Sequence, residues 1–351
     1  FSFSIRMKIE NEIKLDFTDV LIRPKRSTLN SRSKVDLTRK FKFKYSTQEW
    51  NGIPIISSNM DTTGTFEVHD CLTKHNMITA FNKFYTAQDY KSRFYSKGLN
   101  PNNYMISTGI SDSDLENVKL TIKEVGSTWI CIDVANGYMD KLVEFCKKVR
   151  KIYPTKIIVA GNVVTREMVE ELILSGGVDI VKIGIGPGSA CTTRLKTGVG
   201  MPQLSAIIEC ADAAHGVGGH IIADGGITCP GDMAKAFGAG ADFVMVGGQF
   251  AGHDENPGEM RTESNGEKYK MFYGMSSDTA MNKHYGSMAS YRSSEGRTIK
   301  MKYKGKLDDT VLDYLGGLRS TCTYINAKNI KNIPKCTTFV RVNRQLNTIY
   351  A

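Results

Sequence analysis

The stretch IVKIGIGPGSACTTRLKTG, residues 180–198, shows the unit from which the fold is expected to be built. A short apolar run, residues 180–185, passes directly into a loop rich in glycine. Near-continuous apolar runs of this length are typical of strands in a parallel sheet that helices cover on both faces. The stretch therefore predicts a buried parallel strand followed by a loop with a chemical role.

The same pattern recurs on both sides of this stretch. Apolar, β-branched runs occur at residues 53–59, 77–82, 104–109, 129–135, 156–161, 180–185, 220–224 and 243–248. Amphipathic helical patterns lie between them, for example at residues 139–152 and 167–175. Eight alternating units predict an α/β protein with a (β/α)8 TIM barrel. A doubly wound open sheet is the alternative.

Residues 7–351 are expected to form a single TIM-barrel catalytic domain. Residues 7–50 mix charged and apolar positions and predict an N-terminal arm with short strands. Residues 1–6 are too short for a signal peptide, and we expect them to be a remnant of an expression vector. After the last run comes a long polar segment, residues 251–306, in which we expect a flap over the site. A disordered surface loop is the alternative.

The composition is that of a globular protein with anionic small-molecule partners. Of the 351 residues, 41% are hydrophobic and 23% are charged, and the net charge is +10. The basic residues are scattered and no nucleic-acid motif accompanies them, so we expect phosphorylated small molecules rather than nucleic acid. No run approaches the roughly 18 apolar residues of a membrane span, and we expect no membrane partner.

The eight cysteines include no CxxC pair. Their spacing matches neither a disulfide framework nor a zinc motif. Reduced thiols fit an intracellular protein, and we expect a cytoplasmic location.

Cys191 is the strongest candidate for a catalytic group. It lies among small and hydroxylated residues, with Arg194 and Lys196 close behind it. Nearby positive charge favours the thiolate form of a cysteine, and the thiolate is the nucleophile. Glycines in the same loop allow backbone amides to approach a ligand closely. A buried, unreactive thiol in an ordinary turn is the alternative.

Paired glycines after the last two strands form a second signal. Asp224 is followed by Gly225 and Gly226, and the final run ends in Gly247 and Gly248. TIM barrels often bind phosphate on backbone amides after strands seven and eight. We therefore predict a phosphate site there, with two ordinary tight turns as the alternative.

These residues also carry a family resemblance. The pattern GxGPGSxCTTRxKTGxGxPQLSA resembles the catalytic loop of the inosine monophosphate dehydrogenase/GMP reductase family. Further stretches that resemble the family cover nearly the whole chain from Lys14. They include residues 15–29, 31–39, 133–138, 160–176, 211–216, 224–248, 272–277, 293–297 and 316–324.

The resemblance implies an oxidoreductase that uses NADPH to convert GMP to IMP and ammonia. Cys191 would form a covalent thioimidate with C2 of the guanine base, and Thr193 and Glu295 would relay the proton that the leaving amine needs. Without the resemblance, Glu295 would be interpreted as a solvated carboxylate. GMP and IMP are thus the expected small-molecule partners, and family members imply a homotetramer.

The resemblance also implies binding residues. Those for the substrate are Ser189, Asp224, Gly225, Gly226, Gly247, Gly248, Gly274, Met275, Ser276, Arg292, Ser293, Ser294 and Gly296. Those for the cofactor are Ser31, Arg32, Lys83, Asp133, Val134, Ala135, Ile185, Gly186, Met275, Tyr291, Arg292, Ser320, Thr321, Cys322 and Thr323, some of them reaching a neighbouring subunit. A potassium site would involve Gly186, Gly188, Cys191 and Arg194.

Two other functions are weighed beside this one. The dehydrogenase branch of the family oxidises IMP and usually carries an inserted pair of regulatory domains, which this sequence lacks. The loop around Cys191 also resembles the reductive branch. The second alternative is a phosphate-binding barrel without redox chemistry.

Overall fold

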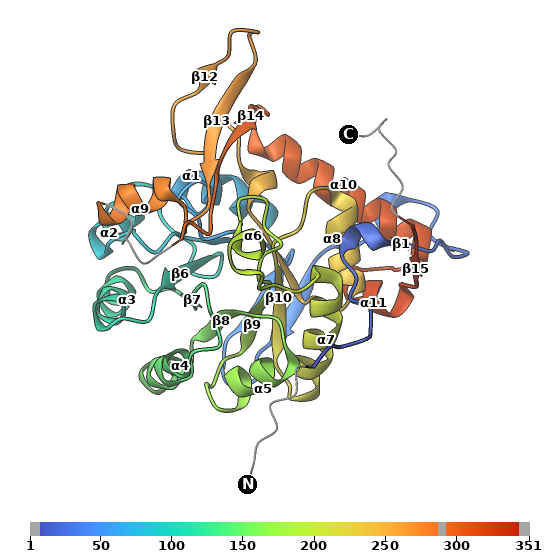
Figure 1. Cartoon of the computed structure of the whole chain (residues 1–351), viewed down its shortest axis with the longest axis horizontal. Coiled ribbons are helices and arrows are strands. Elements are labelled where there is room, and N and C mark those ends of the chain that lie inside the picture. The colour runs from blue at the N-terminus through green and yellow to red at the C-terminus, as the bar shows by residue number, and fades with distance from the viewer. Residues whose placement is uncertain (1–7, 287–292, 344–351) are drawn as a thin grey trace.

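The computed structural model describes residues 8–286 and 293–343, and its centre is a closed barrel of parallel strands (Figure 1). Around the barrel the order is β10, β11, β4, β5, β6, β7, β8 and β9. The bounds are β4 Ile55–Ser57, β5 Ile78–Ala80, β6 Tyr104–Thr108, β7 Trp129–Asp133, β8 Ile157–Val163, β9 Ile180–Ile183, β10 His220–Asp224 and β11 Phe243–Val246. The predicted TIM barrel is confirmed, and closure excludes the open sheet.

Helices surround the strands on the outside of the barrel (Figure 1). They are α1 Phe66–Leu72, α2 Ala87–Lys97, α3 Asp112–Val125, α4 Asp140–Ile152, α5 Arg166–Leu174, α7 Gln203–Gly216 and α8 Pro230–Gly238, whereas the short helix α6 Thr193–Thr197 lies in the loop after β9. The helical patterns predicted at 139–152 and 167–175 are α4 and α5. Within residues 8–286 and 293–343, no helix has both the length and the apolar character to cross a bilayer.

Local sequence signals set the helix ends. The Ser111 side chain caps α3 by accepting from the Asp114 N–H over 3.1 Å, and the Asp114 carboxylate accepts the Ser111 N–H in return. This reciprocal pair satisfies two backbone donors that the first turn leaves free. At the other end Gly126 adopts φ 66°, a left-handed conformation that glycine reaches without a steric penalty.

Side chains alternate between the two buried faces of each strand. Ile55, Ile130 and Val181 point toward the helices and belong to the larger apolar cluster. Ile56 and Ile180 point toward the barrel axis and belong to a second cluster. Because both faces are covered, the strand sequences are apolar at nearly every position.

A hairpin closes the amino-terminal end of the barrel. It consists of β2 Arg39–Lys42 and β3 Glu49–Gly52, paired antiparallel. The Phe41 ring lies 4.3 Å from the Phe243 ring, and the Trp50 ring lies 6.0 Å from that of Trp129. These aromatic side chains fill the space between the first residues of the barrel strands.

The N-terminal arm and the C-terminal residues pack together on the outside of the barrel. Strand β1 Val20–Ile22 pairs antiparallel with β15 Phe339–Arg341. The short 3-10 helices η1 Phe17–Asp19 and η2 Arg32–Lys34 also belong to the arm. Helices α10 Leu307–Ile325 and α11 Ile333–Cys336 pack against α8. The arm thus contains short strands, as predicted.

The segment after β11 is folded in its described part. Strands β12 Arg261–Thr262, β13 Lys268–Tyr273 and β14 Thr298–Lys302 form an antiparallel sheet that extends away from the barrel (Figure 1). Helix α9 Asp278–Tyr285 follows β13. The role of this segment as a flap over the site stays a prediction.

Candidate active site

A cavity of about 580 Å³ opens at the carboxyl ends of the barrel strands. Its walls come from the loops after the strands and from the segment that follows β13. Its volume lies within the range of roughly 300–1,000 Å³ typical of ligand pockets. Because TIM-barrel enzymes carry their active sites at this end of the barrel, the cavity is the candidate active site.

Cys191 lies on the cavity wall, in the loop that leaves β9. Its backbone N–H donates to the Gly188 carbonyl over 3.0 Å, which closes a turn beside the thiol. In the same loop Gly186 has φ 87°, and a Cβ on it would lie 2.4 Å from Cγ of Arg194. Glycine is therefore required at that position. The Cys191 side chain is only partly buried, so the cavity exposes it to a ligand.

A chain of hydrogen bonds runs from the thiol to a carboxylate. The Cys191 thiol donates to Oγ1 of Thr193 over 3.2 Å. The Thr193 hydroxyl in turn donates to Oε2 of Glu295 over 2.8 Å. All three residues line the cavity. The arrangement can carry a proton between the thiol and the carboxylate by way of the hydroxyl.

Backbone pairing holds this chain of groups together. Cys191 and Gly296 form an antiparallel bridge, and the Thr192 N–H donates to the Glu295 carbonyl over 2.8 Å. One residue further, the Arg297 N–H donates to the Ala190 carbonyl over 2.9 Å. The position of Glu295 thus depends on backbone pairing between residues 190–192 and residues 295–297. The site forms only when these two segments pair.

Lys182 is a buried charged centre at the floor of the cavity. It lies on β9 with an exposed fraction of 2%, and its Nζ is 2.6 Å from the Asp133 carboxylate and 2.9 Å from that of Asp224. Burial opposes its charge, but the two carboxylates outweigh burial and raise the pKa of Lys182 above its ordinary value. Burial likewise opposes ionisation of Asp133, yet Lys182 holds the pKa of Asp133 below its ordinary value.

Amide side chains complete this floor. Asn162 donates from Nδ2 to Oδ2 of Asp224 over 2.9 Å and to the Gly184 carbonyl over 2.8 Å. Gln203 donates to the carbonyls of Ile183 and Asp224 over 2.9 and 3.1 Å. Among the described residues both side-chain partners of Asp224 contact Oδ2, which leaves Oδ1 for a ligand.

The predicted phosphate residues gather on one side of the cavity. Gly225 and Gly226 adopt φ 89° and 81°, which expose their backbone after β10. A Cβ on Gly248 would lie 2.7 Å from Oγ of Ser189, so these two residues are direct neighbours. Such a concave arrangement of backbone and a hydroxyl is suited to an anion.

A carboxylate to which the sequence assigned no specific role fastens α9 to the barrel. The buried Asp61 carboxylate, in the loop after β4, accepts from the Tyr273 hydroxyl over 3.0 Å. It also lies 3.1 Å from Nζ of Lys283 and 2.6 Å from Nε2 of His284. The His284 ring stacks on that of Phe84 at 3.4 Å. These contacts fix α9 beside the cavity, which its residues Met281 and Tyr285 help to line.

The structure brings most of the predicted site residues to this cavity. Those that line it are Lys83, Asp133, Val134, Ala135, Ile185, Gly186, Gly188, Ser189, Cys191, Thr193, Asp224, Gly225, Gly226, Gly247, Gly248, Gly274, Met275, Ser276, Glu295 and Gly296. Arg194, Ser293 and Ser294 are not among the lining residues; Ser294 instead accepts from the Thr192 hydroxyl through its carbonyl. Tyr291 and Arg292 lie outside the described residues.

One predicted group of cofactor residues lies apart from the cavity. Ser31 and Arg32 are at η2, which packs against α10, where Ser320, Thr321, Cys322 and Thr323 are found. The structure therefore brings the two halves of this group together, but outside the cavity of the same chain. The Cys322 side chain is fully buried, so only its backbone could face a ligand.

Lys182, Asn162, Gln203 and Asp61 were given no role from the sequence. Lys182 had a detectable signal, because a lysine inside an apolar strand run must point to a paired or functional position. The partners of Asp61 are distant in sequence, and no local pattern indicates them.

Comparisons with known proteins identify the family to which the chain is similar. A family model described as the IMP dehydrogenase / GMP reductase domain matches residues 14–346. The chain is 57% identical over 345 residues to GMP reductase 1 of Homo sapiens, covering 98% of this chain and 99% of the human protein. It is 56% identical to the GMP reductases of Caenorhabditis elegans and Salmonella paratyphi C, covering 98% of this chain and 96% and 99% of those proteins.

Proposed function

The chain belongs to the IMP dehydrogenase / GMP reductase family of oxidoreductases, and from this premise we propose that it catalyses the NADPH-dependent reductive deamination of GMP to IMP and ammonia. The observation that carries the proposal is the hydrogen-bonded line from Cys191 through Thr193 to Glu295. It provides a nucleophile and a proton relay in one cavity, and deamination needs both.

The barrel order gives the two ligands separate sides. The glycine pairs follow β10 and β11, whereas Lys83 follows β5 and Asp133 ends β7; β11 and β7 are opposite one another in the closed order. GMP would place its phosphate near Ser189, Gly225 and Gly248 and extend its base toward Cys191. The cofactor would enter from the β5–β7 side, so that the two ligands meet above the thiol.

In the first half-reaction Sγ of Cys191 bonds to C2 of the guanine base and the bond from C2 to the amine breaks. The thiol proton passes through the Thr193 hydroxyl and the Glu295 carboxylate to the departing amine, which leaves as ammonia. A covalent thioimidate on Cys191 remains. The proton is needed because an amine is a poor leaving group until it is protonated.

In the second half-reaction the bond between Sγ and C2 breaks with its electron pair returning to sulfur. NADPH, when bound, supplies the hydride that takes the place of sulfur at C2. Lys182 stays charged beneath the site because its pKa is raised, and it orients Asp133 and Asp224 toward the two ligands. One proton taken up from solvent returns the Cys191 thiolate to the thiol, and IMP is the product.

A potassium ion is part of the proposal. The carbonyls of Gly186, Gly188 and Cys191 belong to one turn of the loop, and hard monovalent cations prefer such carbonyl groups. The Gly188 carbonyl already accepts the Cys191 N–H, which leaves it a second lone pair. Potassium would supply a fixed positive charge that keeps the loop in shape.

We also propose a homotetramer. Large apolar side chains are exposed at the β1–β15 pair and along α10, where Leu21, Leu312 and Tyr324 are 53%, 51% and 63% exposed. Their burial against other subunits would remove this surface from water. Ser31, Arg32 and the α10 residues lie on the same side of the molecule, where they could reach a neighbour's cofactor.

Two assays run in parallel test the function. Absorbance records NADPH oxidation with GMP, and NAD⁺ reduction with IMP. The proposal expects NADPH oxidation with release of ammonia and IMP. Rapid NAD⁺ reduction with formation of xanthosine monophosphate would instead assign the dehydrogenase reaction, and nucleotide binding without either activity would indicate a barrel without redox chemistry.

A further inference from the structure

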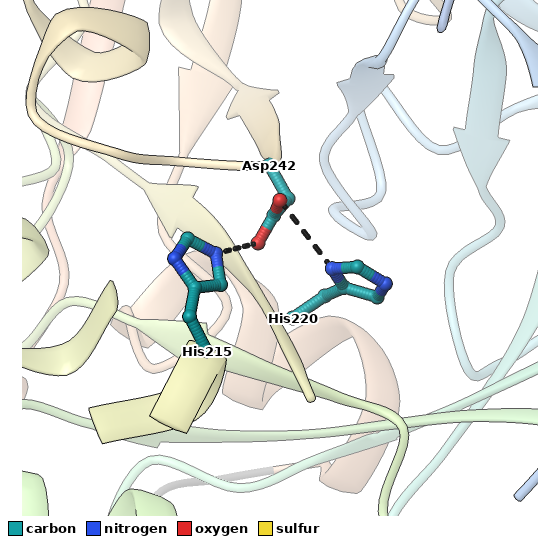
Figure 2. Close-up of side chains that lie close together, drawn as sticks. All are labelled: His215, His220 and Asp242. Atoms are coloured by element: carbon teal, nitrogen blue, oxygen red, sulfur yellow. Dashed lines mark hydrogen bonds and ion pairs between the residues drawn. The ribbon is translucent and has the colours of Figure 1, made fainter. Parts of the chain in front are cut away.

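Three metal-ligating side chains meet at the end of the barrel opposite the cavity (Figure 2). His215 lies in the last turn of α7, His220 is the first residue of β10, and Asp242 immediately precedes β11. Their ligand atoms all lie within 4.8 Å of one another. His215 is exposed and Asp242 is buried, so the group is accessible from solvent on one side.

We propose that this group binds a divalent cation of the zinc class through Nε2 of His215, Nδ1 of His220 and the carboxylate of Asp242. Imidazole nitrogens and a carboxylate are a common zinc ligand set, and three protein ligands leave a fourth position for water.

The hydrogen bonding of His220 is the main argument. Its Nε2 lies 2.9 Å from the Lys42 carbonyl, which can only accept, so Nε2 carries the hydrogen. In the neutral ring Nδ1 then presents a lone pair, and it makes no hydrogen bond by geometry although it is buried. It faces Oδ1 of Asp242 at 3.3 Å, so two lone pairs oppose each other unless a second proton on the ring or a metal cation lies between them, and a cation would take the place of that proton.

This tautomer is the one that a metal ligand requires. Ligating histidines usually donate their second nitrogen to a backbone carbonyl or a carboxylate, which fixes the ring and directs the free nitrogen at the metal. The spacing fits between Nδ1 of His220 and Oδ1 of Asp242, which are 3.3 Å apart, whereas the 2.8 Å between Nε2 of His215 and Oδ2 of Asp242 must lengthen. Zinc bonds of about 2.0–2.2 Å in a tetrahedron place neighbouring ligand atoms about 3.3–3.5 Å apart.

The other contacts of Asp242 leave room for the cation. The Ile221 N–H donates to Oδ2 over 3.0 Å and Arg39 donates to Oδ1 over 2.7 Å, so each oxygen keeps a second lone pair on the histidine side. His215 lies 2.8 Å from Oδ2 and must retreat slightly, which its exposed position allows.

Nearby positive charge should lower the affinity of this site for a cation. Arg39 contacts the same carboxylate, and Lys44 donates to the Val217 carbonyl close to His215. Both oppose a second cation, so removal of the Arg39 charge should tighten binding. The site joins α7, β10 and β11 to the hairpin strand β2 through Lys42, and a bound cation would therefore stabilise the closed end of the barrel.

The test is calorimetric titration of chelator-treated, full-length protein with Zn²⁺, together with thermal unfolding with and without the metal. We expect one site and a raised Tm. His215→Ala should weaken affinity at least tenfold and abolish the Tm shift, and Arg39→Gln should strengthen affinity. His75→Ala is the matched control, because His75 pairs with a carboxylate, Asp308, at 2.6 Å without a second imidazole.

Substitution by Co²⁺ separates this site from the thiols. Tetrahedral cobalt on nitrogen and oxygen shows visible bands without the ultraviolet charge-transfer band of a thiolate ligand. A thiolate band, no Tm shift, or a shift that persists in His215→Ala would each overturn the proposal. None of the three metal-binding side chains lines the cavity. The activity assay of the proposed function is therefore independent of these outcomes.

Discussion

At the amino-terminal end of the barrel the inward-facing side chains are apolar, and Phe41 and Trp50 of the hairpin pack against the aromatic rings of Trp129 and Phe243. At the carboxyl-terminal end the charged side chains of Asp133 on β7, Lys182 on β9 and Asp224 on β10 meet. The large cavity opens only at the second of these two ends. The difference suggests that stability and reactivity are assigned to opposite ends of the same strands.

The largest effect on activity is expected from Cys191→Ala, at the carboxyl-terminal end of the barrel. The substitution should lower kcat about a thousandfold or more, because a covalent route has no easy substitute, while GMP binding and the unfolding free energy change little. Stopped-flow NADPH oxidation and calorimetric GMP binding measure the two effects. Cys229→Ala, which removes an exposed thiol outside the cavity, should keep full activity. Activity within tenfold of wild type would remove Cys191 from the mechanism.

Thiol labelling is a second test of the reactivity of Cys191. Burial raises the pKa to about 12 for the thiols of Cys71, Cys131, Cys146, Cys210 and Cys322. Iodoacetamide should therefore react first with Cys191, ahead of the accessible Cys229 and Cys336. GMP should protect Cys191 and leave Cys229 unprotected.

Glu295→Gln should slow deamination by roughly 10²–10⁴-fold, the usual consequence of losing a general acid or base. The backbone pairing of residue 295 with Thr192 is unaffected, so GMP binding should weaken far less. Rapid-quench measurement of ammonia release tests the step directly. Glu267→Gln is the control, because it alters an exposed carboxylate of the same segment, next to β13. Normal ammonia release in Glu295→Gln would assign the proton to another donor.

Substitutions at the amino-terminal end of the barrel should change the free energy of unfolding rather than the activity. Trp50→Ala should lower the free energy of unfolding by about 3–5 kcal/mol, since it leaves a large void beside three aromatic rings. KM for GMP should stay unchanged in the folded protein. Urea unfolding is the measurement, and Tyr95→Ala, at a 75% exposed aromatic position, should change stability by less than about 0.5 kcal/mol. A large rise in KM in Trp50→Ala would show that the two ends are coupled.

The smallest effect concerns pH and the buried His69 on α1. Burial lowers the pKa of His69 to about 4, from an ordinary value of 6.5. The unfolded chain therefore takes up a proton near pH 6.5 and the folded chain only near pH 4. Stability is fully present above pH 6.5 and falls by about 3 kcal/mol as the pH is lowered through this window.

His69→Phe keeps a ring against Phe81 and Tyr104 but binds no proton. Its unfolding free energy should therefore fall less steeply than that of the wild type between pH 6.5 and 4. Denaturant titrations at several pH values give both curves, and their difference isolates His69 from other titrating groups. Parallel curves would contradict the assignment.

The sequence alone determined the elements and the loop that carries Cys191. Eight apolar runs predicted the strands because parallel strands covered on both faces need apolar residues at nearly every position. The glycines around Cys191, and the pairs after β10 and β11, indicated where the backbone is exposed. These are local properties, and the structure places Cys191 and the glycine pairs at the cavity.

Only the tertiary structure decided which distant residues meet. Glu295 reaches Thr193 across 102 positions of the chain because Thr192 and Arg297 pair with the opposite backbone. The strand run around Lys182 does not show that two carboxylates will surround it, since they come from β7 and β10. Asp61 and His284 lie in separate segments with no shared pattern. Such contacts depend on closure of the barrel, which cannot be predicted from a short stretch of sequence. Closure brings Asp133, Lys182 and Asp224 together at the floor of the cavity.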